Sequence, residues 1–314
     1  MAKGHDNPFD AGHLIGHVKD ATYFVLPRLL DFDGNEDPNL DKADGKLFLP
    51  QLRDWKHEQP FWECHTGFKP IDEMVEPLDG KVTKFMVLEV VGALIVAAIF
   101  IPLANRARTG ERPRGKLWNL FESMLLFIRD QVARPAIGRH DADRFLPFLW
   151  TVFFFILACN LLGMVPWLGS PTGAFATTGV LALITFITVI GAGIAKMGPV
   201  GFWIAQVPPM DLPLVLAIPL KPMIFVIEVL GLCIKHFVLS VRLLANMMAG
   251  HLVLAVVIAF IKAAWDNPSI WGVAPASILG ATALSMLELF VAFLQAYIFA
   301  FLAALFIGMA VHPH

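Results

Sequence analysis

The stretch from Pro222 to Pro268 constrains the fold more than any other part of the sequence. It is apolar and has no proline between its ends, so it predicts a helix of roughly 65–70 Å. Because the apolar part of a bilayer is only about 30 Å thick, such a helix must tilt steeply, bend or form two spans. Arg242 lies in its middle among apolar residues. An arginine at the bilayer centre costs about 2.5–3.5 kcal/mol and normally faces a partner or a water-filled cavity.

The composition indicates an integral membrane protein. Of the 314 residues, 57% are hydrophobic and 16% are charged, which is typical of chains with several membrane spans. The net charge of −2 gives no reason to expect a nucleic acid partner. Cys64, Cys159 and Cys233 are odd in number and scattered, so we expect no disulfide framework. The first residues lack the basic start and apolar core of a signal peptide, so we expect the spans themselves to direct insertion.

We expect an all-α integral membrane protein with about five membrane-embedded helices and one interfacial amphipathic helix. The last two helices should be long, tilted and paired as an antiparallel hairpin. Residues 117–137 have helical periodicity with charges on one face, which favours a helix lying at the membrane interface. The expected spans are Phe85 to Leu103, Phe145 to Trp167, Gly179 to Lys196, Pro222 to Pro268 and Ala276 to Val311.

Two domains are expected, an acidic polar extension at 1–83 and a membrane domain at 84–314, whose hairpin covers 222–312. Within the extension, His13 to Leu30 is apolar enough for a short helix on a membrane surface. The calcium-like start at Asp31 lacks its turn glycine, because Glu36 stands there, and we expect no metal site.

The loop after the first span sets the expected topology. It carries many basic residues against one acid, Glu111, and the positive-inside rule places such a loop in the cytoplasm. We therefore expect the N-terminus outside and the C-terminus in the cytoplasm of a bacterial inner membrane. The basic residues are Arg106, Arg108, Arg112, Arg114 and Lys116.

Polar residues in the last two helices fall into two pairs about the Asp-Asn-Pro-Ser turn at 266–269. If the chain folds antiparallel there, His251 lies level with Glu288, and Arg242 lies level with Gln295. The first pair is nearer the outer surface. A neutral histidine beside a carboxyl is suited to relaying protons, because each group perturbs the other's pKa. A buried hydrogen-bonded pair without further function is the alternative.

A helical wheel shows on which side of the helix each of these polar residues lies. Glu228, Lys235, Arg242 and Asn246 form one polar stripe at about 100° per residue, and His251 lies on the opposite side from Arg242. The arginine and the histidine therefore look into different spaces. A structural arginine satisfied by backbone carbonyls or by Glu228 is the alternative for Arg242, and Lys235 can reach the interface through its long stem.

The sequence VRLLANMMAGH at 241–251 resembles subunit a of the F-type ATP synthase, a family whose motif reads R-L-x-x-N-M-x-A-G. The resemblance covers roughly 85–311 and includes NLLGMVP at 160–166 and the LQAYIF stretch that holds Gln295. It implies that Arg242 is the stator arginine facing a ring of c subunits, with Asn246 and Gln295 as polar neighbours. His251 and Glu288 are exchanged relative to the familiar bacterial pattern. Gly163 stands where many bacterial members carry aspartate.

The resemblance implies a proton path of two offset half-channels separated by Arg242, entered from outside past His251 and Glu288. Glu228 and Lys235 are secondary candidates. The implied partners are the c-ring, b-type peripheral stalk subunits, the rest of the ATP synthase and the bilayer, with no cofactor and no catalytic site of the chain's own. A self-contained cation/proton antiporter is the alternative, although no inverted repeats are visible. Sodium coupling stays open, because the ion-binding carboxylate would lie on another subunit.

Overall fold

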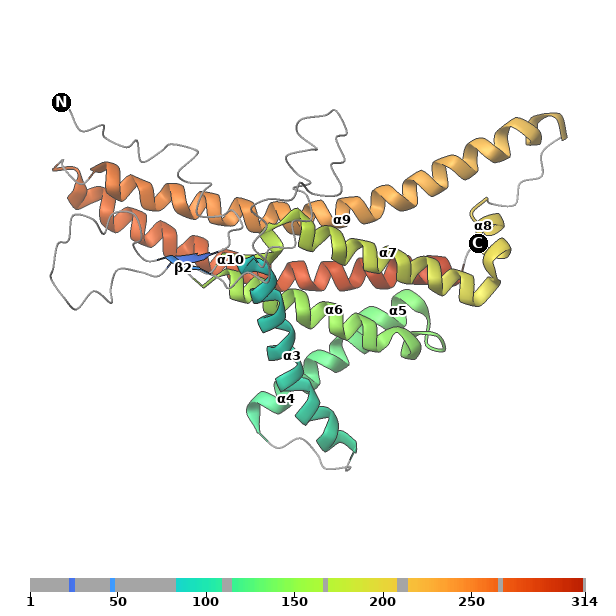
Figure 1. The fold of residues 1–314 in the computed structure, drawn as a ribbon, viewed down its shortest axis with the longest axis horizontal. Helices are drawn as coiled ribbons and strands as arrows, with labels where there is room; N and C mark the ends of the chain where they lie inside the picture. The colour runs from blue at the N-terminus through green and yellow to red at the C-terminus, as the bar shows by residue number, and fades with distance from the viewer. Residues whose placement is uncertain are drawn as a thin grey trace, which may run out of the picture. The chain divides into compact units, whose positions relative to one another are not determined.

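Helices make up most of the structure, a computed structural model that describes residues 23–25, 46–48, 83–108, 115–165, 169–207, 214–264 and 268–312. Figure 1 shows their order along the chain. The strands are β1 (Tyr23–Val25) and β2 (Lys46–Phe48). The helices are α3 (Lys84–Arg108), α4 (Lys116–Phe127), the π-helical η3 (Ile128–Ala133), α5 (Arg134–Ile137), α6 (Ala142–Gly163), the 3-10 helix η4 (Pro171–Gly173), α7 (Phe175–Met197), α8 (Pro199–Ala205), α9 (Leu214–Ala264) and α10 (Ile270–Val311).

Five helices are long and apolar enough to cross a membrane, as predicted. They lie at Lys84–Asn105, Ala142–Gly163, Phe175–Met197, Leu220–Ile261 and Ile270–Val311. Large apolar side chains are exposed along them: Leu94 is 62% exposed, Ile187 60% and Leu279 72%. A water-soluble protein would bury most such residues in a core, whereas lipid is an apolar solvent for them. The chain is an all-α membrane protein.

The last two helices begin earlier than the sequence predicted. Helix α9 starts at Leu214 and continues through Pro219 and Pro222, and α10 starts at Ile270 and contains Pro275. Each proline removes a backbone hydrogen bond, but all three stand within the first nine residues, and long apolar runs follow. At 51 residues α9 is about 77 Å long, and its continuity excludes two separate spans.

Other boundaries moved by a few residues. Helix α6 ends at Gly163 rather than near Trp167, because Pro166 follows three residues later and disfavours helical backbone before it. Helix α7 begins at Phe175 rather than Gly179. The proline-rich connector contains α8, whose first residue is Pro199. Proline suits that position, where its missing N–H leaves no bond unmade.

Part of the extension forms strands. Tyr23–Val25 pairs antiparallel with Lys46–Phe48, with Tyr23 opposite Phe48. The helix predicted from His13 to Leu30 is therefore wrong at 23–25, where aromatic and β-branched residues favour a strand. The rest of that helix, the metal-like motif at Asp31 and Cys64 lie outside the described residues.

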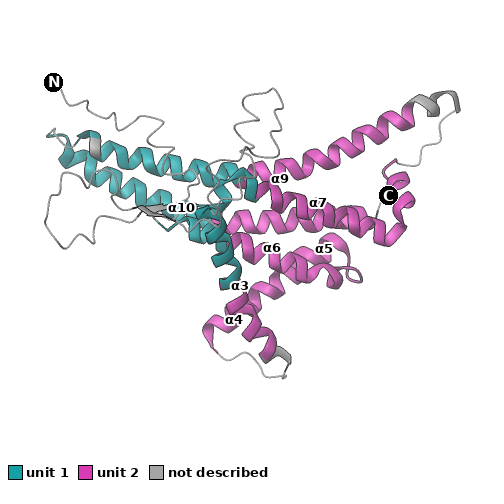
Figure 2. Cartoon of the chain, viewed as in Figure 1, with its two compact units in different colours: residues 1–94, 158–177, 244–291 teal, residues 95–157, 178–243, 292–314 magenta. Residues whose placement is uncertain are grey.

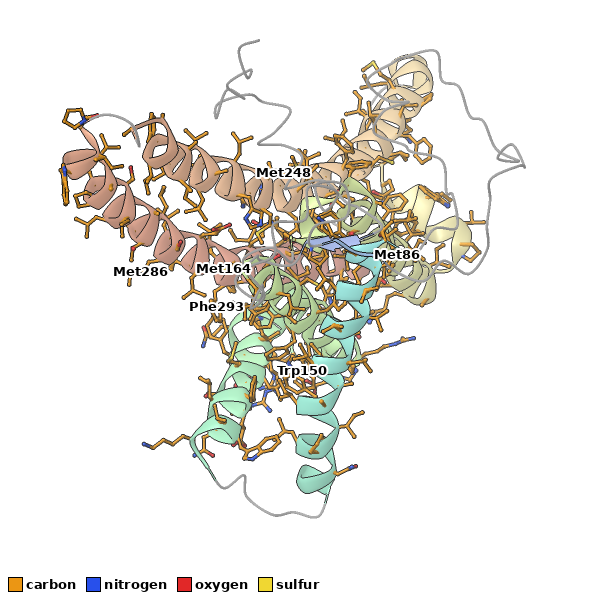
Figure 3. The ribbon with its side chains drawn as sticks, turned by 60° about the vertical axis from the view of Figure 1, so that its left-hand side comes forward. Met86, Trp150, Met164, Met248, Met286 and Phe293 are labelled. Carbon is orange, nitrogen blue, oxygen red and sulfur yellow. The ribbon has the colours of Figure 1, made fainter. Side chains whose placement is uncertain are left out.

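The chain divides into two compact units, shown in Figure 2. Unit 1 comprises Met1–Leu94, Ala158–Thr177 and Leu244–Val291. Within it, the final part of α9 and the first part of α10 run side by side as an antiparallel hairpin (Figures 1 and 3). The predicted hairpin is thus confirmed in the part that unit 1 contains.

Unit 2 comprises Ile95–Leu157, Thr178–Leu243 and Ala292–His314. The rings of Phe100, Phe121 and Phe154 pack together and bring α3, α4 and α6 into contact. Trp150, labelled in Figure 3, donates its indole N–H to the carbonyl of Leu125 at 3.1 Å, which fixes α4 to α6.

Two glycines let helices of unit 2 approach closely. A side chain at Gly193 would overlap the ring of Phe202, so α8 packs directly on α7. A side chain at Gly308 would meet the backbone carbonyl of Ala136, so the end of α5 lies against α10. Small residues at such crossings are typical of membrane helices, because close packing replaces the hydrophobic driving force.

Candidate functional site

His251 and Glu288 face one another across the hairpin of unit 1. His251 Nδ1 lies 3.4 Å from Glu288 Oε1, and the Glu288 side chain is buried, with 8% of the residue exposed. Met248 on α9 and Met286 on α10, labelled in Figure 3, mark the two helix stretches that carry them. The sequence predicted that His251 and Glu288 lie at equal distances from the turn, and in the structure their side chains are in direct contact.

This contact is an ion pair when the histidine is protonated, and it lacks the geometry of a hydrogen bond. Both His251 Nε2 and Glu288 Oε1 are buried with no hydrogen-bond partner among the residues described. A buried polar atom without a partner costs about 1–3 kcal/mol. Folded proteins keep few such atoms, and functional sites are a common reason for them.

Gly250 makes room for the Glu288 carboxyl. A side-chain carbon at position 250 would lie 2.7 Å from Glu288 Oε1 and 3.1 Å from its Cδ. Further toward the turn, the corresponding carbon at Gly280 would lie 3.9 Å from Val257. The added carbon thus meets a side chain more closely at 250, where the carboxyl is held, than at 280. The sequence marked Gly250 only as a small residue suited to helix packing.

Arg242 lies in unit 2 and is half-buried. No carboxylate in the described part of the chain forms an ion pair with it. Ser240, two residues earlier, is buried and donates to Thr178 Oγ1 of α7 at 3.1 Å. Since residues two apart point to nearly opposite sides of a helix, the packed side of α9 faces α7 and leaves the arginine on another side.

The polar stripe of α9 is progressively more buried along the helix. Glu228 and Lys235 are exposed, while Arg242 and Asn246 are half-buried. Glu228 forms no ion pair with Arg242, so the alternative in which that glutamate satisfies the arginine is not what this structure contains. Gln295 on α10, also in unit 2, is only 1% exposed.

Sequence reasoning missed polar residues near the start of α3 and around the α6–α7 connection, all in unit 1. Thr177 Oγ1 donates to Glu89 Oε1 at 2.6 Å. Thr172 Oγ1 donates to Asn160 Oδ1 at 2.8 Å and lies 2.9 Å from Ser170 Oγ. The rule that singled out Arg242, a charge inside an apolar run, also applies to Glu89.

Gly163 is held against this polar group. A side-chain carbon there would lie 2.5 Å from Ser170 Oγ and 3.0 Å from its Cα. An aspartate at this position would therefore require Ser170 to move, which accounts physically for glycine here.

Two charged clusters are centred on carboxylates outside the spans, both in unit 2. Asp130 accepts hydrogen bonds from Arg129 and Arg134, and the hydrogen bond from Arg129 lowers the pKa of that carboxyl. Asp141 accepts from Lys196 Nζ at 2.9 Å, which lowers its pKa in the same way. Across the described segments, no three His, Cys, Asp or Glu side chains are grouped so as to hold a metal ion.

Comparison with known proteins identifies the family. The sequence model described as ATP synthase A chain matches residues 86–308. ATP synthase subunit a of Myxococcus xanthus is 44% identical over 240 residues, which are 76% of this chain and 76% of the relative. ATP synthase subunit a of Anaeromyxobacter dehalogenans strain 2CP-C is 39% identical over 305 residues, 97% of this chain and 74% of the relative. The protein of the same description from Chloroherpeton thalassium is 39% identical over 236 residues, 74% and 67% of the two chains. The chain belongs to the ATP synthase A chain family, that of the stator subunit a of F-type ATP synthases.

Proposed function

We propose that this chain conducts protons to and from a rotating ring of c subunits through two half-channels, with Arg242 between them. The observation that carries the proposal is the buried Glu288 carboxyl facing His251 at 3.4 Å in the α9–α10 hairpin. A carboxyl beside an imidazole supplies the two kinds of group that most often transfer protons in proteins.

In the outer half-channel, protons enter past His251 and Glu288. Each group takes a proton in turn, and the next acceptor is a carboxylate on the rotor. The two buried atoms without hydrogen-bond partners, His251 Nε2 and Glu288 Oε1, are the atoms to which a moving proton would bind. Gly250 holds this arrangement open by leaving the carboxyl its space.

Arg242 separates the half-channels. A guanidinium remains charged at any working pH, so it favours the ionised form of a rotor carboxylate that comes opposite and drives proton release to the cytoplasmic side. It also blocks direct passage of protons between the half-channels. Its partial exposure and its freedom from ion pairs with described residues leave it available to a partner subunit.

The other polar residues support this path. Asn246 and Gln295 act as polar neighbours of the arginine along the rotor interface, while Glu228 and Lys235 line the path toward the cytoplasm in a secondary role. Each charge that crosses the membrane contributes about 2.3 kcal/mol per 100 mV, and this energy turns the rotor. The chain itself has no catalytic site in this scheme.

The proposal includes an orientation and partners. The acidic extension at 1–83 and the N-terminus lie outside a bacterial inner membrane, and the C-terminus is cytoplasmic, as the basic loop at 106–116 favours. Residues 84–314 form the membrane domain, with 222–312 as the half-channel hairpin tilted against the c-ring. Residues 117–137 lie at the cytoplasmic interface, and b-type subunits of the peripheral stalk hold the chain in place.

Replacement of Arg242 tests the proposal. In proteoliposomes containing the whole complex, Arg242→Ala should abolish ATP synthesis driven by a proton gradient while leaving the complex assembled. Arg242→Lys should restore it only in part, because a buried lysine can lose its proton. Arg139→Ala removes an exposed arginine outside the spans and should leave synthesis unchanged. Parental synthesis in Arg242→Ala would contradict the stator role, and proton transport by the isolated chain would favour an antiporter instead.

A further inference from the structure

Glu89 is an acid inside the first span that the proposed path does not use. It lies five residues after the start of α3, about 7.5 Å along the helix, and its side chain is half-buried. Neighbouring residues on the same helix are apolar. A carboxyl in this setting is costly and usually functional.

The contacts of Glu89 suit a group that changes its protonation. The hydrogen-bond donor to its carboxyl among the described residues is a neutral hydroxyl, that of Thr177 at 2.6 Å. No cation in the described segments forms an ion pair with Glu89. A carboxylate fixed by an arginine or lysine would be held in its charged form, whereas one held by a hydroxyl can take up a proton without breaking an ion pair.

A group of buried polar side chains belongs to the same unit as Glu89. Gly92, one turn further along α3, packs against Cys159 of α6, whose Sγ lies 3.3 Å from where a carbon at 92 would stand. The next residue of α6 is Asn160, which accepts from Thr172. Ser170, Thr172 and Asn160 are all buried in unit 1, and the same unit holds His251 and Glu288.

We propose that Glu89 is a further proton acceptor of the outer half-channel, positioned by the hydroxyl of Thr177. The inference rests on the proposed function, because the path it serves is the one that leads to His251 and Glu288. The carboxylate takes one proton from the water on the outer side, forming an O–H bond. It then gives that proton to the next acceptor and returns to the carboxylate. In the expected orientation α3 starts on the outer side, as do the turns between α6 and α7 and between α9 and α10.

The test uses the whole complex in proteoliposomes, with ATP-driven proton pumping and passive proton conductance as readouts. Glu89→Gln keeps the size of the side chain but cannot be protonated, so we expect both rates to fall about ten-fold or more at unchanged assembly. Glu89→Asp keeps a carboxyl and should retain more of each rate than Glu89→Gln. Glu122→Gln, which neutralises an exposed acid on α4, should match the parent.

Conductance of Glu89→Gln equal to that of the parent at every pH would overturn the inference. If Glu89→Gln fails to assemble, Thr177→Val is the variant that tests the role of Glu89. It removes the hydrogen bond that Thr177 donates to Glu89 and keeps the side-chain volume nearly constant. A conductance whose pH dependence differs from the parent's supports the role of Glu89, and an identical pH dependence overturns it. Among the described residues near Glu89, the other titratable groups are Lys84 on α3 and Cys159 on α6, and both are unchanged in these variants.

Arg242→Ala, measured in the same vesicles, separates the two proposals. If Arg242→Ala stops pumping while Glu89→Gln matches the parent, only the inference about Glu89 fails. If Arg242→Ala pumps normally, the proposed function fails, whatever the result for Glu89.

Discussion

Gly250 and Glu288 are so close that the first carbon of any side chain at 250 would lie 2.7 Å from the carboxyl oxygen of Glu288. The residue next to His251 in the chain thus determines where the partner of His251 can stand. The carboxyl occupies the space that Gly250 leaves, and this brings it to 3.4 Å from the imidazole.

Gly250→Ala should therefore displace the carboxyl. The added methyl group must push Glu288 or spread the two helices, and overpacking of this kind costs about 1–3 kcal/mol. We expect ATP-driven proton pumping to fall several-fold, roughly in line with a cost of that size, while the complex still assembles. Gly272→Ala is the matched control, since nothing lies within 4 Å of the added carbon. Equal pumping by the two variants would show that Glu288 does not need this space.

The pairing of His251 with Glu288 predicts coupling between them. His251→Glu and Glu288→His should each slow pumping strongly, because each leaves two like groups in contact. The double variant restores one acid and one imidazole, so it should pump faster than the product of the two single effects. The measurement is a double-mutant cycle on pumping rates. If the pumping rate of the double variant equals the product of the two single effects, the residues act separately.

The sequence predicted the five spans and the hairpin because both follow from strong physical demands. A bilayer needs about 20 apolar residues for each helix, and the Asp-Asn-Pro-Ser turn fixes which residues of α9 and α10 lie level. The contact of His251 with Glu288 was predicted only from their equal distance to the turn. Arg242 was identified by a different demand of the bilayer, because a charge within an apolar run is costly there.

Other features depend on contacts that the sequence does not display. The prolines 219, 222 and 275 read as helix boundaries, yet each stands within the first nine residues of a long helix that continues past it. The strand at Tyr23–Val25 depends on a partner more than twenty residues away. Glu89 is visible in the sequence as a charge in an apolar run, but its hydrogen bond from Thr177, on a helix distant in sequence, is not. The sequence does not show that Gly250 and Gly163 leave space for the side chains of Glu288 and Ser170, because those contacts exist only in the folded chain.

Cysteine labelling tests the orientation. A membrane-impermeant thiol reagent added from the outer side of intact cells should modify Cys64, which belongs to the acidic extension. Cys159 is buried and Cys233 lies within the apolar length of α9, so both should react slowly from either side. Cys64→Ser is the control that assigns the label. Labelling of Cys64 only from the cytoplasmic side would reverse the topology and the order of the half-channels.

The Asp141–Lys196 pair predicts a pH-dependent contribution to stability. The hydrogen bond from Lys196 lowers the pKa of Asp141, so its stabilisation is present above the ordinary aspartate pKa of about 3.9 and is lost as the pH falls through the lower folded value. Asp141→Asn should lower the thermal midpoint of the purified complex slightly at pH 7, and the difference from the parent should shrink in acid. Asp143→Asn, at a more exposed carboxyl, should have a smaller effect. A constant difference at every pH would contradict the ion-pair origin.

The contact between Gly308 and the carbonyl of Ala136 affects how tolerance to mutation along α10 should be interpreted. No proton is proposed to pass there, yet every other amino acid at 308 must separate two backbones. In a survey of viable variants, position 308 would appear as restricted as position 288, one for lack of space and the other for its chemistry. Only the amount of chain that accumulates in the membrane distinguishes them: it should fall for substitutions at 308 and hold for Glu288→Gln.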